Sequence, residues 1–396
     1  MPFDKLKFFH SPHKPKILYV INHIDWFWSH RYSLAKAVQD QGWDVYVACH
    51  GASKDAALVK EGFTPVDLPE YKGGIRPLSI LRVIQTLRDE IKRINPDIVH
   101  AITIKYAFMT SLSTIFVKSP KVILTIAGLG YLFSEDSLKA RVVRFLGKPA
   151  LKTAFARKGV YLIFQNTDDL NIMVRSGLAN KENAEVILGS GVNIHKFVPS
   201  PEPGEKSPVV FMPTRLVKEK GVAVFVKASK IVEAKGYNAN FIIGGGLDKN
   251  NPSALTEEEM QEMLKGTDVT WRGKIIDMPR MYRRSNIVVY PSYYREGVPK
   301  VLLEAAAAGR AIVTTDHPGC REVVEHNRNG LLVPVKDAEK TAEAIITLLD
   351  NKSMRDRMAK SARRKAVNEF NVSLVNARTI DIYEAKIGNN KSHIDA

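Results

Sequence analysis

Cysteine is scarce in this sequence, with Cys49 and Cys320 the only two among 396 residues. Two cysteines cannot form a disulfide framework and are too few for a zinc cluster, so the pair favours a reducing compartment. Long apolar runs are also absent, since none reaches the ~18 residues that cross a bilayer. Residues 1–16 carry charge but lack the apolar core of a signal peptide. We therefore expect neither a secreted disulfide scaffold nor a membrane-spanning protein.

Acidic residues are outnumbered, because 42 Asp and Glu face 58 Lys and Arg and leave a net charge of +16. The excess is denser in residues 1–200. A basic surface suits nucleic acid, anionic lipid or a phosphorylated substrate, and charge alone does not choose among them. The 45% apolar and 25% charged content is ordinary for a globular protein. It excludes collagen, a coiled coil and a disordered tail.

Apolar runs alternate with helical patterns in the first 200 residues. The runs are continuous, which is typical of strands buried on both faces. We expect strands at Lys16–Ile21, Asp44–Ala48, Ile98–His100, Val122–Thr125 and Val160–Phe164, and helices including Tyr32–Gln41 and Leu78–Ile94. Such alternation predicts a parallel sheet with helices on both sides.

A change of composition at residues 199–208 divides the chain. Four prolines and a glycine in ten residues exclude a helix or a central strand, so we place a linker there. Strands resume at Val209–Met212, Asn240–Ile243, Val269–Trp271, Ile287–Tyr290, Ala311–Thr314 and Leu331–Val333. The sequence predicts an α/β protein of two doubly wound, Rossmann-like domains, 1–198 and 209–372, facing a central cleft. We expect the C-terminal helix, 373–396, to pack back on the first domain.

The most informative stretch, 290–309, joins a predicted strand to a helix. Its loop carries Glu296 and Gly297, Pro299 suits the first helical turn, and Glu304 lies within the helix. Free N–H groups and a partial positive charge at a helix N-terminus favour a diphosphate. Glu304 lies about five residues into the helix, roughly 7.5 Å along its axis, which matches the reach from a diphosphate to a ribose diol. A plain surface loop before an amphipathic helix is the alternative, and the junction favours a binding site.

A basic pattern follows the first strand of the second half. Arg215 offers a fork of donors and Lys220 a compact charge, a pair that suits two phosphates. Because Lys218 and Lys220 alternate with Glu219, a solvated basic turn is the alternative. Together with the two glutamates, the pattern favours a diphosphate site.

These motifs resemble the retaining GT-B glycosyltransferases of family 4. The resemblance rests on the order and spacing of residues 215–221, Glu296, Glu304 and residues 329–333 along the second half. It implies the GT-B fold, with a nucleotide-sugar-binding second domain and an acceptor-binding first domain. In the first half, residues 97–100 resemble the family's strand that ends in an active-site histidine.

The resemblance implies a role for each matched residue. Arg215 and Lys220 would hold the donor diphosphate, and Glu304 the nucleotide ribose. Glu296 would hold the donor sugar, which His100 would contact from the first domain. The remaining donor contacts would come from Gly273, Lys274, Gly297, Val298, Pro299 and Lys300. The family needs no metal ion or other cofactor, because the two cations neutralise the leaving diphosphate.

Two departures from the family pattern concern the acceptor and the donor. The family's Gly-Gly loop after the first strand is replaced by residues 22–31, where Arg31 and the next helix N-terminus offer positive charge instead. Trp26 and Trp28 either line an acceptor groove or pack on their own helix, and packing is favoured. Lys300 after Pro299 resembles a bacterial subgroup that extends polyprenyl-diphosphate-linked sugars with UDP-N-acetylhexosamine donors.

Residues 139–158 form a basic segment with seven Lys and Arg and no acid. We expect a helix that Pro149 kinks or splits, with four basic residues on one side. A basic amphipathic segment suits an anionic membrane surface, and a solvated basic face is the alternative. The four residues on one side are Arg141, Arg144, Lys148 and Lys152, and Lys72, Arg76, Arg82 and Arg88 extend the patch.

The sequence therefore predicts transfer of a hexose or N-acetylhexosamine from a nucleotide-diphosphate sugar, expected to be UDP-linked, to a polyprenyl-diphosphate-linked sugar in bacterial surface glycan synthesis. The expected location is cytoplasmic and peripheral on the inner face of the cell membrane. We expect no nucleic-acid partner, because the basic residues are not interleaved with aromatic stacking platforms. Two alternatives stay open: a glycosyltransferase with a soluble acceptor, and an inactive basic binding protein on the same fold.

Overall fold

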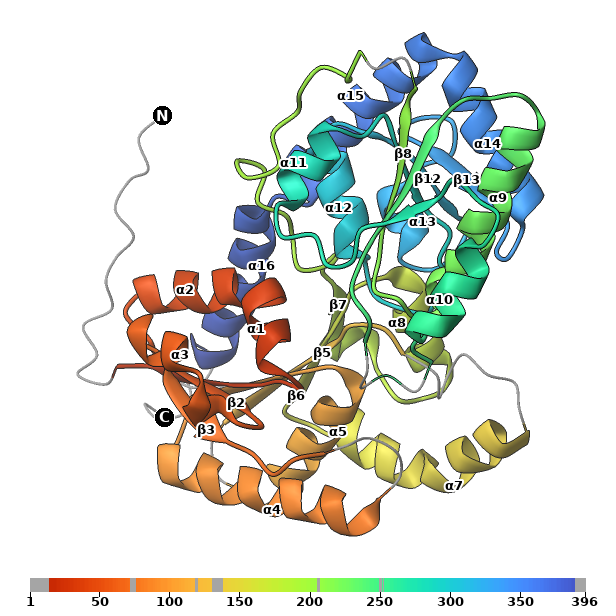
Figure 1. Ribbon diagram of the computed structural model, residues 1–396. Helices are drawn as coiled ribbons and strands as arrows, with labels where there is room; N and C mark the ends of the chain where they lie inside the picture. The colour runs from red at the N-terminus through yellow and green to blue at the C-terminus, as the bar shows by residue number, and fades with distance from the viewer. Residues whose placement is uncertain are drawn as a thin grey trace. The chain divides into compact units, whose positions relative to one another are not determined.

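The computed structural model describes residues 14–71, 76–117, 120–129, 138–204, 207–248, 251 and 253–388, and only the backbone of 138–146. The chain divides into two compact units. The first comprises 1–125, 149–162 and 380–396, and the second comprises 126–148 and 163–379. Figure 1 shows two sheets with helices packed around them.

The N-terminal sheet has seven strands in the order β3-β2-β1-β4-β5-β6-β7. Its strands are β1 (Lys16–Val20), β2 (Asp44–Cys49), β3 (Thr64–Asp67), β4 (Ile98–Ile102), β5 (Lys121–Ile126), β6 (Val160–Phe164) and β7 (Ala184–Val186). The order reverses at β1, which pairs in parallel with β2 on one side and β4 on the other. In doubly wound sheets, ligands bind at such a reversal, beyond the carboxyl ends of the strands.

The helices around this sheet follow the strands in the alternation that the sequence predicts. They are α1 (Ile24–His30), α2 (Tyr32–Asp40), η1 (Ala52–Lys54), α3 (Ala56–Lys60), α4 (Pro77–Ile94), α5 (Ile104–Ser113), α7 (Leu138–Phe155), α8 (Thr167–Arg175) and η2 (Lys181–Asn183). Of the two outcomes expected at Pro149, a split does not occur, because α7 continues through this residue. A kink there stays a prediction, since an interior proline removes one backbone donor and crowds the preceding turn.

The C-terminal sheet has six strands in the order β10-β9-β8-β11-β12-β13. They are β8 (Val209–Pro213), β9 (Asn240–Gly244), β10 (Thr270–Trp271), β11 (Ile287–Tyr290), β12 (Ala311–Thr315) and β13 (Leu331–Val333), all in parallel pairs. The helices are η3 (Lys218–Lys220), α9 (Val222–Ala234), α10 (Glu257–Leu264), α11 (Met278–Arg283), α12 (Lys300–Ala307), α13 (Cys320–Val323), α14 (Ala338–Asp350), α15 (Lys352–Glu369) and α16 (Val372–Gly388).

Both faces of this second sheet are buried. Val210 and Met212 of β8 join one core with residues of α9 and α14. Phe211, between them, points to the opposite core with residues of α12 and α15. Because successive strand residues face opposite sides, a strand covered on both sides must be apolar throughout. This explains the continuous runs in the sequence.

Residues 199–204, within the proline-rich segment, lie in the second unit and are fixed there by arginines. The buried Arg310 donates to the carbonyl of Ser200 at 2.9 Å. Arg355 forms two hydrogen bonds with the carboxylate of Glu202, at 2.9 and 3.0 Å. This end of the segment is therefore anchored through side chains. The division into domains at 199–208 stays a prediction.

The predicted fold class is confirmed by the two parallel sheets. Each predicted strand is present, with ends within two residues of the expected ones. The sequence patterns missed β3 and β7, the two edges of the first sheet. β3 contains Pro65 and exposes half of its residues, and β7 has three residues, so neither forms an apolar run.

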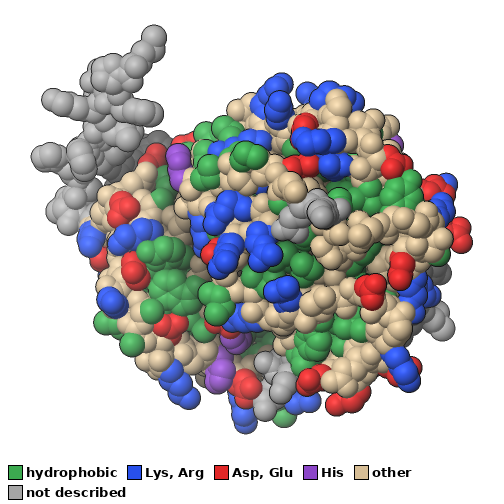
Figure 2. Space-filling view, turned by 45° about the horizontal axis from the view of Figure 1, so that its top comes forward, with side chains coloured by type: hydrophobic (Ala, Val, Ile, Leu, Met, Phe, Trp, Pro, Cys, Tyr) green, Lys and Arg blue, Asp and Glu red, His purple; other side chains and the backbone are tan. Residues whose placement is uncertain are grey.

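Charged side chains of both signs are interspersed on one face of the molecule (Figure 2). Figure 2 shows Lys and Arg side chains mixed with Asp and Glu on the face in view. Of the basic segment 139–158, Lys148 and Lys152 are exposed, whereas the side chains of Arg141 and Arg144, and the whole of Lys72, lie outside the described residues. Across the described ranges, the helices lack the combination of length and apolar character that a bilayer span requires.

Candidate active site

A buried lysine, a tyrosine and a glutamate form the centre of the site in the second unit. The Nζ of Lys220 lies 2.7 Å from the hydroxyl of Tyr290 and 2.5 Å from Oε1 of Glu296. The Tyr290 hydroxyl also donates to Glu296 Oε1, at 2.7 Å. The Lys220 side chain is 4% exposed, and burial lowers its pKa while Glu296 opposes that change. The three groups thus bring a cation and a carboxylate to one point at the carboxyl end of β11.

The backbone before Lys220 places this cation. β8 ends at Pro213, and η3 follows. The C-cap of η3 is Gly221, with φ of 80°. A Cβ on Gly221 would lie 2.1 Å from the carbonyl oxygen of Pro291, so only glycine fits the turn. The close approach sets η3 directly against the loop that follows β11.

The loop of Glu296 is held by contacts within the second unit. The amide of Gly297 donates to the carbonyl of Ala127 at 3.2 Å. Arg295 forms an ion pair with the buried Asp169 at 3.1 Å. A Cβ on Gly297 would lie 2.0 Å from Oε1 of Gln165, so a side chain there would displace Gln165. The loop is therefore fixed from several directions, which presents the Gly297 and Val298 backbone in a defined geometry.

Helix α12 starts beside this loop with an open N-terminus. Its N-cap is Pro299, no side chain caps it, and its first turn holds no acidic residue. Free backbone donors at such an end attract anions. Burial lowers the pKa of Lys300, in the first turn, and the Glu304 carboxylate opposes that change. The predicted strand–loop–helix junction is therefore present, with its positive end uncapped.

Glu304 lies on α12 and is 9% exposed. Its Oε2 accepts a hydrogen bond from the hydroxyl of Tyr282 at 3.2 Å. Burial raises the pKa of this carboxyl group, while Lys300 and the Tyr282 hydrogen bond oppose the change. A buried carboxylate with acceptor capacity to spare suits a diol, which offers two hydroxyl donors.

Arg215 does not hydrogen-bond to the Lys220 cluster. Its side chain is 61% exposed and pairs with Asp248, with Nη1 2.8 Å from Oδ2. It is nonetheless close enough that its charge lowers the pKa of Lys220. A diphosphate near Lys220 would compete with Asp248 for this guanidinium, because an exposed ion pair is weak.

Gly273 and Lys274 follow β10 at the same edge of the sheet. Gly273 has φ of 63°, and its carbonyl accepts from the amide of Gly245 at 2.7 Å. The Lys274 Cβ lies 3.6 Å from the position of a Cβ on Gly246. The backbone amides of Thr214 and Leu216 donate to the carbonyls of Gly244 and Gly246, respectively. The ends of β8, β9 and β10 therefore lie close together. The predicted contacts to the base thus lie next to the loop of Arg215.

His100 belongs to the first unit and is buried in it. Its Nδ1 lies 2.5 Å from the hydroxyl of Tyr383, and its Nε2 lies 2.7 Å from Oγ1 of Thr125. The side chain is 1% exposed, and burial holds its pKa well below the usual value. The predicted contact with a sugar requires one of these two hydrogen bonds to be exchanged.

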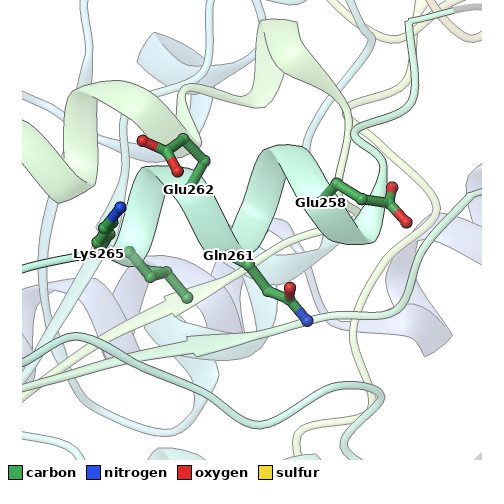
Figure 3. Close-up of a pocket in the computed structure, with 5 residues that line it drawn as sticks. Glu258, Gln261, Glu262 and Lys265 are labelled. Carbon is green, nitrogen blue, oxygen red and sulfur yellow. The ribbon is translucent and has the colours of Figure 1, made fainter.

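Sequence reasoning missed several residues that shape the site. Tyr290 was recognised as the end of a strand, but its hydroxyl joins Lys220 to Glu296. The Asp169–Arg295 pair spans residues far apart in the chain and belongs to no local pattern. A separate surface depression is lined by α10 residues and Lys265 and carries none of the site groups; in Figure 3 Glu258 and Glu262 lie on successive turns of that helix.

Gly319 gives a prediction about how the loops of the site fit together. It has φ of 85°, and a Cβ there would lie 1.8 Å from the carbonyl oxygen of Gly297. We expect Gly319→Ala to lower the free energy of unfolding by about 3 kcal/mol, combining left-handed strain with overpacking. Gly236 has φ of 84° but no heavy atom within 4 Å, so Gly236→Ala isolates the strain and should lose only about 1 kcal/mol. Urea titration measures both, and equal losses would contradict the packing argument.

The fold is shared with solved glycosyltransferases. A glycosyltransferase from Rickettsia africae superposes with a TM-score of 0.76 at 19% identity, over 95% of this chain and 99% of that one. The Anabaena protein HepE, crystallised with UDP-glucose, gives 0.74 at 17% identity, over 93% and 99%. At such identities the likeness shows the fold.

Curated relatives align along most of the chain. The N,N'-diacetylbacillosaminyl-diphospho-undecaprenol alpha-1,3-N-acetylgalactosaminyltransferase of Campylobacter jejuni is 28% identical over 372 residues, 91% of this chain and 96% of the relative. The UDP-Gal:alpha-D-GlcNAc-diphosphoundecaprenol alpha-1,3-galactosyltransferase of Escherichia coli is 23% identical, over 84% and 87%.

Two family models match the two halves in succession. The model of glycosyl transferase 4-like proteins matches residues 16–166, and that of glycosyl transferases group 1 matches residues 193–365. The matched segments contain the N-terminal sheet up to β6 and the whole of the Lys220, Glu296 and Glu304 site. The two models together span most of the chain, both relatives above are named as glycosyltransferases, and the two sheets are parallel, so the chain belongs to the family 4 glycosyltransferases of GT-B fold.

Proposed function

We propose that this glycosyltransferase moves a hexose or N-acetylhexosamine from a UDP-sugar to a sugar on a polyprenyl diphosphate, with retention of configuration. The observation that carries the proposal is the buried Lys220–Tyr290–Glu296 cluster beside the uncapped N-terminus of α12. A cation and free backbone donors attract a diphosphate, and a carboxylate next to them accepts from sugar hydroxyls. The sugar and the nucleoside of a donor would thus lie on opposite sides of one diphosphate site.

The donor would lie across the carboxyl edge of the second sheet. Arg215 and Lys220 hold the diphosphate, with α12 donating from its first turn. Glu304 accepts from the ribose diol, and the backbone at Gly273 and Lys274 contacts the base. Glu296, with the backbone of Gly297, Val298 and Pro299 and the Lys300 side chain, holds the sugar.

We propose the same-side chemical step that the resemblance to retaining glycosyltransferases implies. The bond between the sugar's anomeric carbon and the diphosphate oxygen breaks, and the acceptor hydroxyl oxygen bonds to that carbon from the same side. The acceptor proton passes to the departing phosphate oxygen, so charge and atoms balance. Lys220 and Arg215 stabilise the negative charge that grows on the diphosphate, which is the main electrostatic contribution of the protein.

We propose that the reaction needs no metal ion, because these two cations occupy the role of a divalent ion at the diphosphate. Excess EDTA should leave turnover within about twofold of the untreated rate, since a bound metal would otherwise contribute several kcal/mol. The measurement is UDP release with and without chelator, followed by addition of Mg²⁺ or Mn²⁺. A rate that collapses with chelator and returns with metal would contradict this assignment.

The acceptor assignment is supported by the relatives and by surface charge. The names of both relatives specify a sugar linked to undecaprenyl diphosphate. The exposed Lys148 and Lys152 belong to the basic segment 139–158, and each basic group near an anionic leaflet contributes about 1 kcal/mol. We therefore propose reversible docking on the inner face of the cell membrane. Co-sedimentation with anionic but not neutral vesicles tests it, and equal recovery with both would favour a soluble acceptor.

Nucleotide-sugar hydrolysis tests the proposed donor. The purified protein is incubated without metal with UDP-GlcNAc, UDP-GalNAc, UDP-Glc, UDP-Gal and GDP-Man. Slow release of UDP from one UDP-sugar is the expected result. No turnover with any donor and no thermal stabilisation by UDP or GDP would instead identify an inactive binding protein on this fold.

A further inference from the structure

Arg31 is a buried cation with an unsatisfied Nε in the described part of the chain. The residue is 5% exposed, and its Nε is fully buried without an acceptor among the residues that the structure describes. The ring of Trp26 lies against it, with its centroid 5.6 Å from the guanidinium carbon. A buried charge without an ionic partner is costly, so such residues are usually paired with a carboxylate.

The surroundings of Arg31 are neutral. Burial lowers its pKa, and among the described residues the groups that oppose this change are the hydroxyls of Tyr383 and Tyr19, not carboxylates. Tyr383 is bonded to His100, whose ring lies 5.6 Å from that of Tyr19. Burial keeps His100 neutral at physiological pH, and burial raises the pKa of both tyrosines, so none supplies a negative charge. The positive charge of Arg31 therefore has no counter-charge among the residues that the structure describes.

Arg31 also lies where a doubly wound sheet binds ligands. Tyr19 on β1 and His100 on β4 are register partners, so they face the same side of the sheet where its strand order reverses. Arg31 is the N-cap of α2, the nine-residue helix that follows β1 and α1. No side chain caps α2, and its first turn contains no acidic residue. The end of this helix and the guanidinium thus combine two sources of positive charge at one position.

We propose that Arg31 and the N-terminus of α2 form a second anion site, in the first unit, that takes one phosphoryl group of a diphosphate. The identity of that diphosphate rests on the proposed function, and it is either the sugar nucleotide or the polyprenyl diphosphate of the acceptor. An anion supplies the missing counter-charge, so binding relieves the cost of burying Arg31. The site is separate from Lys220, which belongs to the second unit.

The test uses pyrophosphate as the probe, in a Lys220→Met background that removes the other cation. Arg31→Met keeps the length of the side chain and removes its charge. We expect Arg31→Met to weaken pyrophosphate binding at least tenfold and to raise the melting temperature of the ligand-free protein. The control Arg93→Met removes an exposed arginine that pairs with Glu90, and it should change neither value.

A purely structural Arg31 gives the opposite pattern. Arg31→Met would then lower the melting temperature, or fail to fold, and pyrophosphate binding to the folded Arg31→Lys variant would equal that of the parent. Either result overturns the proposal. If the proposal is correct, the Arg31→Lys variant binds pyrophosphate more weakly than the parent protein and more tightly than the Arg31→Met variant. Lysine keeps the positive charge but lacks the planar fork of donors.

Kinetics in the otherwise wild-type protein distinguish the two sources of phosphate. A higher KM for the lipid-linked acceptor with an unchanged donor KM assigns the site to the acceptor, and the reverse assigns it to the donor. Unchanged values for both overturn the proposal. UDP binding to the second unit is the independent check. Absence of UDP binding would contradict the proposed function. Normal UDP binding together with no effect of the Arg31 substitutions would contradict only the second anion site.

Discussion

Lys220→Met should reduce the rate of sugar transfer by about a hundred- to a thousandfold, the usual loss when one preorganised charge at a leaving group is removed. The side chain is 4% exposed and contacts both Tyr290 and Glu296, so water cannot easily replace it. The loss should appear in kcat, because the charge that Lys220 stabilises grows as the glycosidic bond breaks. Steady-state kinetics at saturating donor measure it.

Lys218 provides the matched control for this prediction. It lies two positions away in η3, but its side chain is 54% exposed and pairs with Glu259 at 2.8 Å. Lys218→Met should leave kcat near the wild-type value, since exposed ion pairs contribute little. Removing Lys220 also leaves the Glu296 carboxylate without its cation, which can destabilise the fold. The double variant Lys220→Met/Glu296→Gln removes both charges, so its melting temperature shows how much of the loss in kcat comes from misfolding. A near-normal kcat in Lys220→Met would remove this lysine from the mechanism.

Glu304→Gln should weaken UDP binding by about a hundredfold, because two hydrogen bonds from the ribose diol to a charged acceptor are each worth about 1.5–3 kcal/mol. The amide keeps the shape of the side chain and can still accept from Tyr282. Calorimetric titration with UDP measures the affinity, and Tyr282→Phe is the control that keeps the carboxylate. Equal affinities for UDP in wild type and Glu304→Gln would contradict the ribose assignment.

The pH dependence of the same residue follows from its burial. The folded-state pKa of Glu304 is raised, so the carboxylate needed for the diol is lost at a higher pH than for an ordinary glutamate. On acidification, the UDP affinity of the wild type should therefore begin to fall at a higher pH than the ordinary pKa of glutamate would give. The UDP affinity of Glu304→Gln should not change over the same pH range. Without ligand the sign is opposite, because the folded state holds this proton more tightly and stability falls as pH rises through the raised pKa. Glu304→Gln should thus melt at a higher temperature than wild type at neutral pH.

The sequence predicted the second half of the molecule well because its signals are local. Each strand there is a short apolar run, and Glu296, Gly297 and Glu304 fall within one strand–loop–helix junction that a reader of the sequence can place. Arg215 and Lys220 were placed in one loop for the same reason. The structure adds that the two differ in surroundings, since Lys220 is buried with Glu296 and Arg215 is exposed with Asp248.

Long-range contacts lie beyond such patterns. The burial of His100 depends on Tyr383, which lies 283 residues later in the chain, and no periodicity links them. The missing counter-charge of Arg31 among the described residues is a property of its surroundings in the fold, which only a folded chain reveals. Pro149 was expected to kink or split its helix, and α7 is not split, because the propensity of one residue is weaker than that of the surrounding turns.

The product of a complete reaction tests the central proposal most directly. The protein is incubated with the donor that it hydrolyses and with a short polyprenyl-diphosphate-linked sugar, and the product is analysed by mass spectrometry and by NMR of its new anomeric centre. We predict a mass gain of one hexose or N-acetylhexosamine on the lipid-linked sugar, with the anomeric configuration of the donor retained. Transfer to soluble sugars alone, or a product of inverted configuration, would contradict it.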